Sequence, residues 1–336
     1  MSPKGAKRPN HSVNSSTHAR SESAPKRGEE AKPQRELIHA PGLRKSSSGR
    51  NAADRRLGWY LLAPALMFLG TLTVYPALWV LWLALQYRIP VFGISRWAGL
   101  DHFAFLAVDT RFWNAAWVTG LFTVASVALE GALGLAVAVA LRGQRGGRRT
   151  ALALLLLAWA LPSVVTAKMF EWLYHPAGGL VNFLLGGRAI NWLGDPDLAL
   201  PSVILADVWR ATPFVALLCY ARLLTIAPEL YEAARVDGAA GFQAFVRITW
   251  PLVRPILLVT LLFRTLDALR AFDIMFVLTG GGPAGSTESL TVYAYRALFQ
   301  TLQVGFGSAI GVVVFALVMV VAALYLRLIG RQEGTA

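Results

Sequence analysis

Four charged residues lie inside a strongly apolar stretch of the chain, where they could contact a polar ligand. Arg264, Asp267, Arg270 and Asp273 recur at every third position within residues 251–279. Charged groups in such a stretch are costly and usually face a cavity or a partner. Carboxylate and guanidinium groups can hydrogen-bond to a ligand rich in hydroxyls, and aromatic rings can pack on its apolar faces. Pure ion pairing between helices is the alternative, and the residues leave both open.

The rings that could serve such a site are Phe272, Phe276 and Trp209. A step of three residues turns a helix by about 300°, so the four charges spread over about 180° and cannot all line one narrow pore. We therefore expect some charges to bridge helices, and we assign Asp267, Arg270 and Asp273 with the three rings to a substrate pathway. Weaker candidates are Glu130, Lys168, Glu171, Asp207 and Arg210, of which Lys168 and Glu171 are spaced to pair with each other.

Residue patterns typical of catalysis and of metal binding are missing from the sequence. The histidines form no pair at metal-ligand spacing, and a single cysteine, Cys219, excludes a disulfide or a cysteine-based metal site. No Gly-Lys dipeptide occurs, so there is no phosphate-binding P-loop, and no Gly-x-Ser-x-Gly elbow is present. We expect no catalytic residue, no metal and no cofactor in this chain. An integral membrane enzyme stays an alternative without a residue cluster to support it.

The composition is that of a membrane protein. The chain has 336 residues, of which 55% are hydrophobic and 15% charged, whereas soluble domains carry about 25% charged residues. The formal net charge is +13, but residues 1–58 hold 13 Lys and Arg against 5 Asp and Glu, which gives +8 in this segment alone. Such a localised charge favours a basic tail beside anionic lipid over nucleic-acid binding. We expect residues 1–56 to form a disordered cytosolic tail.

Six apolar segments are long enough to cross a bilayer, which needs about 20 helical residues. The fold class we expect is all-α, a polytopic membrane protein with six transmembrane helices. The first segment lies too deep in the chain for a cleaved signal peptide. The expected spans are residues 57–85, 114–141, 150–172, 200–224, 251–279 and 306–328.

The distribution of Lys and Arg gives the orientation of these spans. With the N-terminus inside, the inner segments hold 23 of the 32 Lys and Arg, the outer segments hold 5, and 4 lie within spans. The segment 142–149 alone contributes four arginines. We therefore expect a multi-pass protein of the cytoplasmic membrane with both termini in the cytosol.

The loop between the fourth and fifth spans carries the most specific signals. Pro228 suits a first helical position, and Gly238 can adopt the left-handed conformation that ends a helix. The sequence thus predicts a short helix over 228–237, a reversal, and a second short helix reaching Pro251. Small residues lie near one face of the first helix, which suits docking into a partner's cleft. A plain connecting helix on the membrane surface is the alternative.

This loop resembles the EAA loop of ABC importer permeases. The matching residues are Glu232-Ala-Ala-x-x-Asp-Gly-Ala239, then Phe245-x-x-Ile248-x-x-Pro251-x-x-x-Pro255. Trp250 stands where the carbohydrate branch usually has Leu. Asp207-Val-Trp-Arg-x-x-Pro213-Phe and Phe276-Val-Leu-Thr-Gly-Gly-Gly-Pro283 also agree with the branch that includes maltose, glycerol-phosphate and trehalose permeases, and Phe263-Arg-Thr-Leu-Asp-Ala-Leu-Arg-Ala-Phe272-Asp is similar to trehalose importer permeases. These motifs indicate the class of substrate and not the individual sugar.

The resemblance implies a type I ABC importer permease fold and a division of labour between subunits. Residues 57–112 would form the first helix and an extracytoplasmic loop, and residues 113–330 a permease core of five helices whose EAA loop spans 228–251. Glu232, Ala233, Ala234, Asp237 and Gly238 would couple this chain to separate ATPase subunits, which bind the ATP.

The other partners implied by the resemblance are a second permease, an extracytoplasmic sugar-binding protein, the sugar and membrane lipid. A homodimer stays possible beside the implied heterodimer. The competing interpretation is a self-contained ion- or proton-coupled carrier. Such a carrier would not need an EAA-type loop, and it often shows a duplication that this sequence lacks.

Overall fold

The computed structural model describes residues 47–333 except residues 145 and 240. The predicted tail therefore lies largely outside the described residues, although helix α1 already begins at Ser47. The described residues divide into two units between Ala65 and Leu66. The described part of the first unit belongs to α1, and the packing and the sites described below lie within the second unit.

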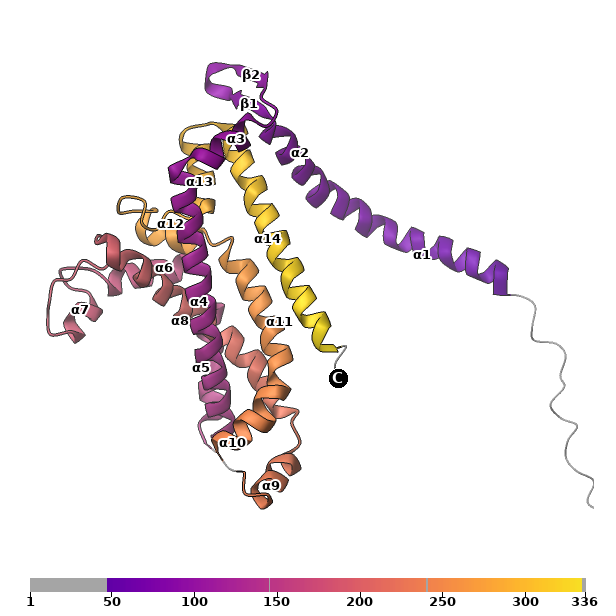
Figure 1. Ribbon diagram of the computed structural model, residues 1–336, viewed down its shortest axis with the longest axis vertical. Coiled ribbons are helices and arrows are strands. Elements are labelled where there is room, and N and C mark those ends of the chain that lie inside the picture. The colour runs from indigo at the N-terminus through magenta and orange to yellow at the C-terminus, as the bar shows by residue number, and fades with distance from the viewer. Residues whose placement is uncertain (1–46, 145, 240, 334–336) are drawn as a thin grey trace, which may run out of the picture. The chain divides into compact units, whose positions relative to one another are not determined.

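The protein is mostly helical, and its elements follow the chain in the order of Figure 1. The α-helices are α1 (Ser47–Leu69), α2 (Tyr75–Ala84), α3 (Asp101–Val108), α4 (Thr110–Gly143), α5 (Arg148–Ala160), α6 (Ser163–Leu173), α7 (Leu180–Leu184), α8 (Pro196–Leu224), α9 (Pro228–Val236), α10 (Phe242–Ala244), α11 (Trp250–Ala268), α12 (Asp273–Thr279), α13 (Leu290–Tyr295) and α14 (Val304–Glu333). Short π-helical turns cover Gly70–Val74, Phe245–Thr249 and Arg296–Gln300, and a 3₁₀ turn covers Pro90–Phe92.

The all-α fold class is confirmed, and a small β-hairpin is the one sheet among the described residues. Strands β1 (Gln86–Ile89) and β2 (Ile94–Trp97) pair antiparallel, with Gln86 opposite Trp97 and Ile89 opposite Ile94. The turn between them ends at Gly93, whose φ of 62° is a left-handed conformation that glycine adopts without strain. We call this part of the second unit the hairpin end and the opposite part, which carries α9, the α9 end (Figure 1).

Among the described residues, five helical stretches are long and apolar enough to cross a membrane. They are Gly58–Ala84, Thr110–Gly143, Pro196–Leu224, Phe242–Ala268 and Val304–Gly330. The predicted span 150–172 is instead the pair α5 and α6, which is bent by 99° and makes a sixth span if counted as one. The bend lies at Leu161 and Pro162. Proline disfavours helical backbone in the preceding residue, and Leu161 is accordingly extended.

The predicted span 251–279 is wrong as one continuous helix. Helix α11 ends at Ala268, and α12 begins only at Asp273. The carbonyl of Ala271, freed by this break, accepts hydrogen bonds from the hydroxyls of Thr291 at 2.7 Å and Ser289 at 3.3 Å. The break places Arg270 beyond the end of α11 and Asp273 at the start of α12, so the angular spacing expected for one helix does not apply to them.

The hydrophobic core of the second unit forms where α4 packs along α8, with α11 against both. One cluster of buried residues joins Phe122, Val203 and Met275, and another joins Leu141, Leu223 and Val253. A third cluster brings α14 against α13 and the start of α4. This packing holds α4, α8 and α11 at fixed positions, and the site described next lies among α6, α8, α11 and α12.

Candidate functional site

A polar cavity of about 240 Å³ lies where α6, α8 and the α11–α12 break meet. Three carboxylates and three arginines dominate its wall. The lining residues are Ser163, Asp207, Arg210, Arg264, Asp267, Ala268, Arg270, Ala271, Phe272, Asp273 and Ile274. Because the charges on this wall balance, its polar groups can hydrogen-bond to a ligand rich in hydroxyls without requiring that the ligand be charged.

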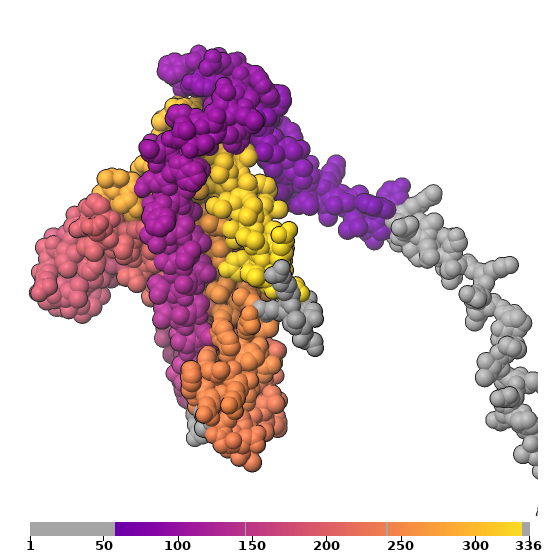
Figure 2. Space-filling view, in the orientation of Figure 1, coloured from indigo at the N-terminus to yellow at the C-terminus, as the bar shows by residue number. Residues whose placement is uncertain are grey.

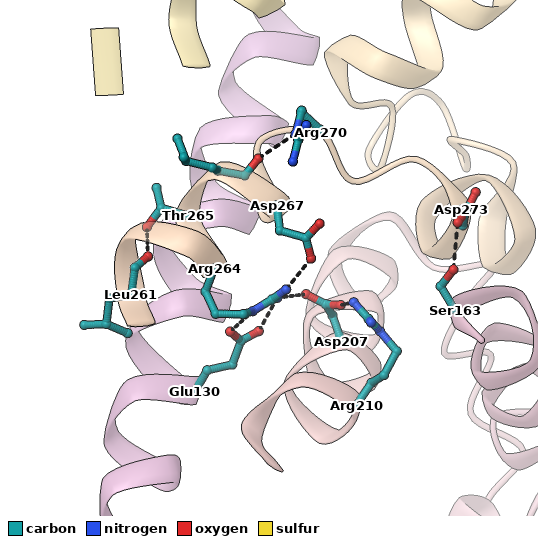
Figure 3. A network of polar contacts seen from close by, with 11 residues as sticks. Glu130, Ser163, Asp207, Arg210, Leu261, Arg264, Thr265, Asp267, Arg270 and Asp273 are labelled. Carbon is teal, nitrogen blue, oxygen red and sulfur yellow. Dashed lines mark hydrogen bonds and ion pairs between the residues drawn. The ribbon is translucent and has the colours of Figure 1, made fainter. Parts of the chain in front are cut away.

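Arg264 is the centre of the charged network in this cavity (Figure 3). Its Nε and Nη2 atoms donate to the two carboxylate oxygens of Glu130 on α4 at 2.6 and 2.8 Å. The Nη2 atom also donates to Asp207 on α8 at 3.0 Å, and Nη1 donates to Asp267 on α11 at 2.6 Å. One guanidinium thus ties three helices together.

The members of this network differ strongly in exposure. The Glu130 side chain is 0% exposed and that of Arg264 is 6% exposed, whereas that of Asp267 is 58% exposed. Burial of a charge is tolerated only when it is paired and hydrogen-bonded. Glu130 therefore has a structural role, since its buried ion pair with Arg264 joins α4 to α11. Asp267 instead presents a carboxylate oxygen to the cavity.

The remaining charged residues on the cavity wall make fewer hydrogen bonds than Arg264. Arg210 donates to the second oxygen of Asp207 at 2.8 Å. Asp273 accepts a hydrogen bond from the Ser163 hydroxyl at 2.7 Å, and Arg270 donates from Nε to the backbone carbonyl of Leu266 at 3.0 Å. Figure 3 shows Asp273 and Ser163 facing each other across from the Arg264 network. Polar groups are therefore available on opposite walls.

The structure brings together most of the residues predicted for a substrate pathway. Asp267, Arg270, Phe272 and Asp273 line the cavity, whereas Phe276 and Trp209 do not. The Phe276 ring stacks on Phe272, with 5.0 Å between centroids, and so backs the cavity wall. Trp209 packs edge-on against Phe170 at 5.6 Å. The predicted pair of Lys168 and Glu171 is present, with 2.6 Å between Nζ and Oε2.

Sequence reasoning underrated the buried part of the site. Glu130, Asp207 and Arg210 were weaker candidates, and Arg264 was not assigned to the pathway. The sequence does indicate that these residues are paired, because a charged residue within a span needs a partner. The identity of the partner was not visible, because 134 residues separate Glu130 from Arg264.

A second polar network lies at the hairpin end, and no motif in the sequence predicts it. The carboxylate of Glu288, 3% exposed, accepts from Arg111 Nε and Nη2 at 2.8 and 2.7 Å and from Arg296 Nη1 at 2.6 Å. Arg296 Nη2 also donates to the carbonyl of Gly280 at 2.6 Å. This network fixes the glycine-rich turn after α12 to the start of α4.

Tyr293 extends the same network. Its hydroxyl donates to Asp109 at 2.6 Å, and the Arg111 guanidinium lies 4.7 Å from its ring centroid. Burial raises the pKa of Tyr293 above its ordinary value, and the hydrogen bond to Asp109 raises it further. The phenol therefore stays protonated and keeps donating to Asp109 throughout the physiological pH range.

The predicted helix between the fourth and fifth spans is present as α9. Gly238 follows it with a φ of 76°, as expected for the residue that ends it. The second short helix predicted to reach Pro251 is not separate, because helical backbone continues from Phe242 into α11. Glu232, Ala233 and Asp237 are exposed, and Ala234 is half-buried. Figure 2 shows the orange α9 segment at the tip of the α9 end.

Within the described residues, no group of three or more His, Cys, Asp or Glu side chains is arranged to hold a metal ion. The carboxylates of the cavity are engaged by arginines and by a serine hydroxyl. The carboxylates that line this cavity are therefore paired within the protein.

Comparison with known proteins gives consistent results over most of the chain. Residues 131–333 match the family described as "Binding-protein-dependent transport system inner membrane component". The trehalose/maltose transport system permease protein MalF of Thermococcus litoralis is 38% identical over 83% of this chain and 95% of its own length. The trehalose transport system permease protein SugA of Mycobacterium tuberculosis is 36% identical over 85% of this chain and 92% of its own length.

Solved structures share the fold. A chain from the crystal structure of a bacterial ABC transporter involved in the import of the acidic polysaccharide alginate superposes with a TM-score of 0.73 at 23% identity. The match covers 84% of this chain and 99% of the other. The polar cavity and α9 both lie within the region that the family comparison matches.

Proposed function

The chain belongs to the family of binding-protein-dependent transport system inner membrane components, and from this premise we propose that it forms the sugar pathway of an ATP-driven importer together with a second permease. The chain is a transport component with the type I importer permease fold and several membrane-spanning helices. ATP would be bound and hydrolysed by separate ATPase subunits. The α9 end would face the cytosol, together with both termini, in agreement with the Lys and Arg distribution.

The observation that carries this proposal is the exposed helix α9. Val236 is 88% exposed and Leu230 is 48% exposed, on a helix that also exposes Glu232. An exposed short helix between two spans, with apolar and charged side chains at its surface, can serve as the contact surface for a partner. We assign the ATPase as that partner, with Glu232, Ala233, Ala234, Asp237 and Gly238 at the contact.

The polar cavity supports the choice of a carbohydrate as substrate. Asp267, Arg270 and Asp273 offer planar acceptors and donors, and Phe272 offers a ring face. Relatives named for trehalose and maltose transport share more than a third of their residues with this chain over most of its length. In the working importer, a sugar-binding protein at the hairpin end would deliver the sugar. The spans would then reorient around the sugar when ATP closes the ATPase subunits.

The test uses two variants of the α9 region in the assembled importer. Gly238→Val places a β-branched residue at a positive φ, and Glu232→Lys reverses a charge at the proposed contact. Both variants should reach the membrane, lose ATP-driven sugar uptake and retain less ATPase on purification. Binding of sugar to the separate binding protein should stay unchanged.

A matched control for Gly238→Val is Gly93→Val, at the hairpin end. Both glycines have positive φ, and a Cβ at either position meets nothing within 4 Å. The control should keep the ATPase bound at normal levels. Normal uptake in both α9 variants, with the ATPase still attached, would mean that α9 is only a connector and would refute the proposal.

A further inference from the structure

The Tyr231 side chain anchors helix α9 to the rest of the second unit, in addition to the chain connections at the two ends of the helix. Tyr231 is the α9 residue that packs against the buried cluster containing Leu141, Leu223 and Val253. Among the described residues, it is also the one α9 side chain that hydrogen-bonds to another helical segment. The rest of α9 is exposed or half-exposed.

The Tyr231 hydroxyl contacts two different membrane-crossing stretches at once. Arg142, in the last turn of α4, donates from Nη1 to the phenolic oxygen, and its guanidinium carbon lies 4.1 Å from the ring centroid. The phenolic oxygen also lies 2.8 Å from Oγ1 of Thr249, the last residue of the π-helical turn that leads into α11. Because Arg142 can only donate, the phenol proton is available to Thr249.

The surroundings of these contacts are open. A cavity of about 600 Å³ lies beside them, and it is lined by residues of α4, α9 and the start of the α11 stretch, including Arg142, Tyr231, Arg235, Phe245 and Thr249. Continuous packing would transmit a displacement of α9 at many points. Beside the chain connections at the two ends of α9, the Tyr231 contacts give its displacement a direct route to α4 and α11.

We propose that Tyr231 is the positioning residue that passes movement of α9 to α4 through Arg142 and to α11 through Thr249. The inference rests on the proposed function, since it assigns α9 a moving partner. Its consequence is specific, because α4 and α11 also supply Glu130, Arg264 and Asp267 of the polar network. A displacement of Tyr231 therefore acts on α4 and α11, the two helices that supply these residues of the charged network beside the polar cavity.

The test is the number of sugar molecules imported per ATP hydrolysed, measured in proteoliposomes with the complete importer. Tyr231→Phe keeps the ring over Arg142 and removes both hydroxyl contacts, so this ratio should fall about fivefold, the equivalent of one net hydrogen bond. Tyr231→Ala also removes the cation–π contact and should lower it by at least about tenfold. The ATPase should co-purify normally with both variants, and ATP hydrolysis should continue.

Tyr325→Phe is the matched control. It also removes a tyrosine–threonine hydrogen bond, of 3.0 Å to Thr265, but between α14 and α11 and away from α9. Its ratio should equal that of the wild type. In addition, the double variant Thr249→Val with Tyr231→Phe should have the same ratio of sugar imported to ATP hydrolysed as Tyr231→Phe alone. Both changes remove the same hydrogen bond between Tyr231 and Thr249.

Three results would overturn the inference. A wild-type ratio for Tyr231→Phe and Tyr231→Ala would show that movement reaches the spans by another route. An equal loss in Tyr325→Phe would make the effect nonspecific, and loss of the ATPase from Tyr231→Phe would make Tyr231 a docking residue. Failure of the proposed function is distinguishable, because wild-type importer would then take up sugar without ATP or purify without an ATPase.

Discussion

Replacing Arg264 by methionine should destabilise the folded bundle strongly. Four hydrogen bonds from its guanidinium reach Glu130, Asp207 and Asp267. The substitution leaves the Glu130 carboxylate, which is 0% exposed, without its partner. Removing one member of a buried ion pair costs about 3–5 kcal/mol in folding free energy, because a buried charge is left uncompensated. Asp207 suffers less, since it keeps its bond to Arg210.

The neighbouring acids define a graded series. Asp267→Asn should cost about 0–1 kcal/mol, because the Asp267 side chain is 58% exposed and solvent weakens its ion pair. Glu130→Gln should fall between the two, since Arg264 keeps both aspartates. The double variant Glu130→Leu with Arg264→Met should recover most of the loss, because apolar replacement of a whole buried pair is often neutral.

The assay is the thermal unfolding midpoint of the assembled importer in detergent. The midpoint is measured as the temperature at which half of the complex no longer stays monodisperse after heating. The expected order of destabilisation is Arg264→Met, then Glu130→Gln, then Asp267→Asn, with the double variant close to the wild type. A wild-type midpoint for Arg264→Met would refute the reasoning, as would a double variant no more stable than Arg264→Met alone.

Three further outcomes are expected. Asp267→Asn should reduce sugar uptake at matched abundance, because it removes an exposed carboxylate from the cavity wall; wild-type uptake would remove Asp267 from the pathway. Glu288→Gln should cost about 1–3 kcal/mol and speed proteolysis at the hairpin end, since it removes the negative charge and one of the two acceptor oxygens that Arg111 and Arg296 share; unchanged proteolysis would count against this. A single cysteine placed at residue 190 should react with a membrane-impermeant reagent in intact cells, whereas one placed at residue 146 should react only after the cells are opened. The reverse pattern would invert the topology.

Local signals were enough to predict α9. Pro228 at the first turn and Gly238 after the last act through their own backbone preferences, so the neighbouring chain fixes where the helix begins and ends. The end of α11 at Ala268 carries no such signal, because no glycine or proline interrupts residues 263–273. Hydroxyls of Ser289 and Thr291, distant in sequence, satisfy the carbonyl that this break frees.

The candidate site shows the same division. The sequence marks Glu130, Asp207 and Arg264 as costly charges inside spans, and it therefore predicts that each needs a partner. Which charges meet depends on how α4, α8 and α11 pack, and side-chain periodicity within one helix contains no such information. Glu130 and Asp267 lie on different helices, yet both bind the same guanidinium.

The 99° bend between α5 and α6 has a consequence for how the protein is made. Helix α5 has 13 residues and α6 has 11, which give lengths of about 20 and 16 Å against a hydrocarbon core of about 30 Å. Neither half can complete a crossing alone, and α8, against which both pack, is synthesised after them. Stable integration of this stretch therefore comes late in translation, and a nascent chain that stops before α8 leaves it without the helix that anchors it.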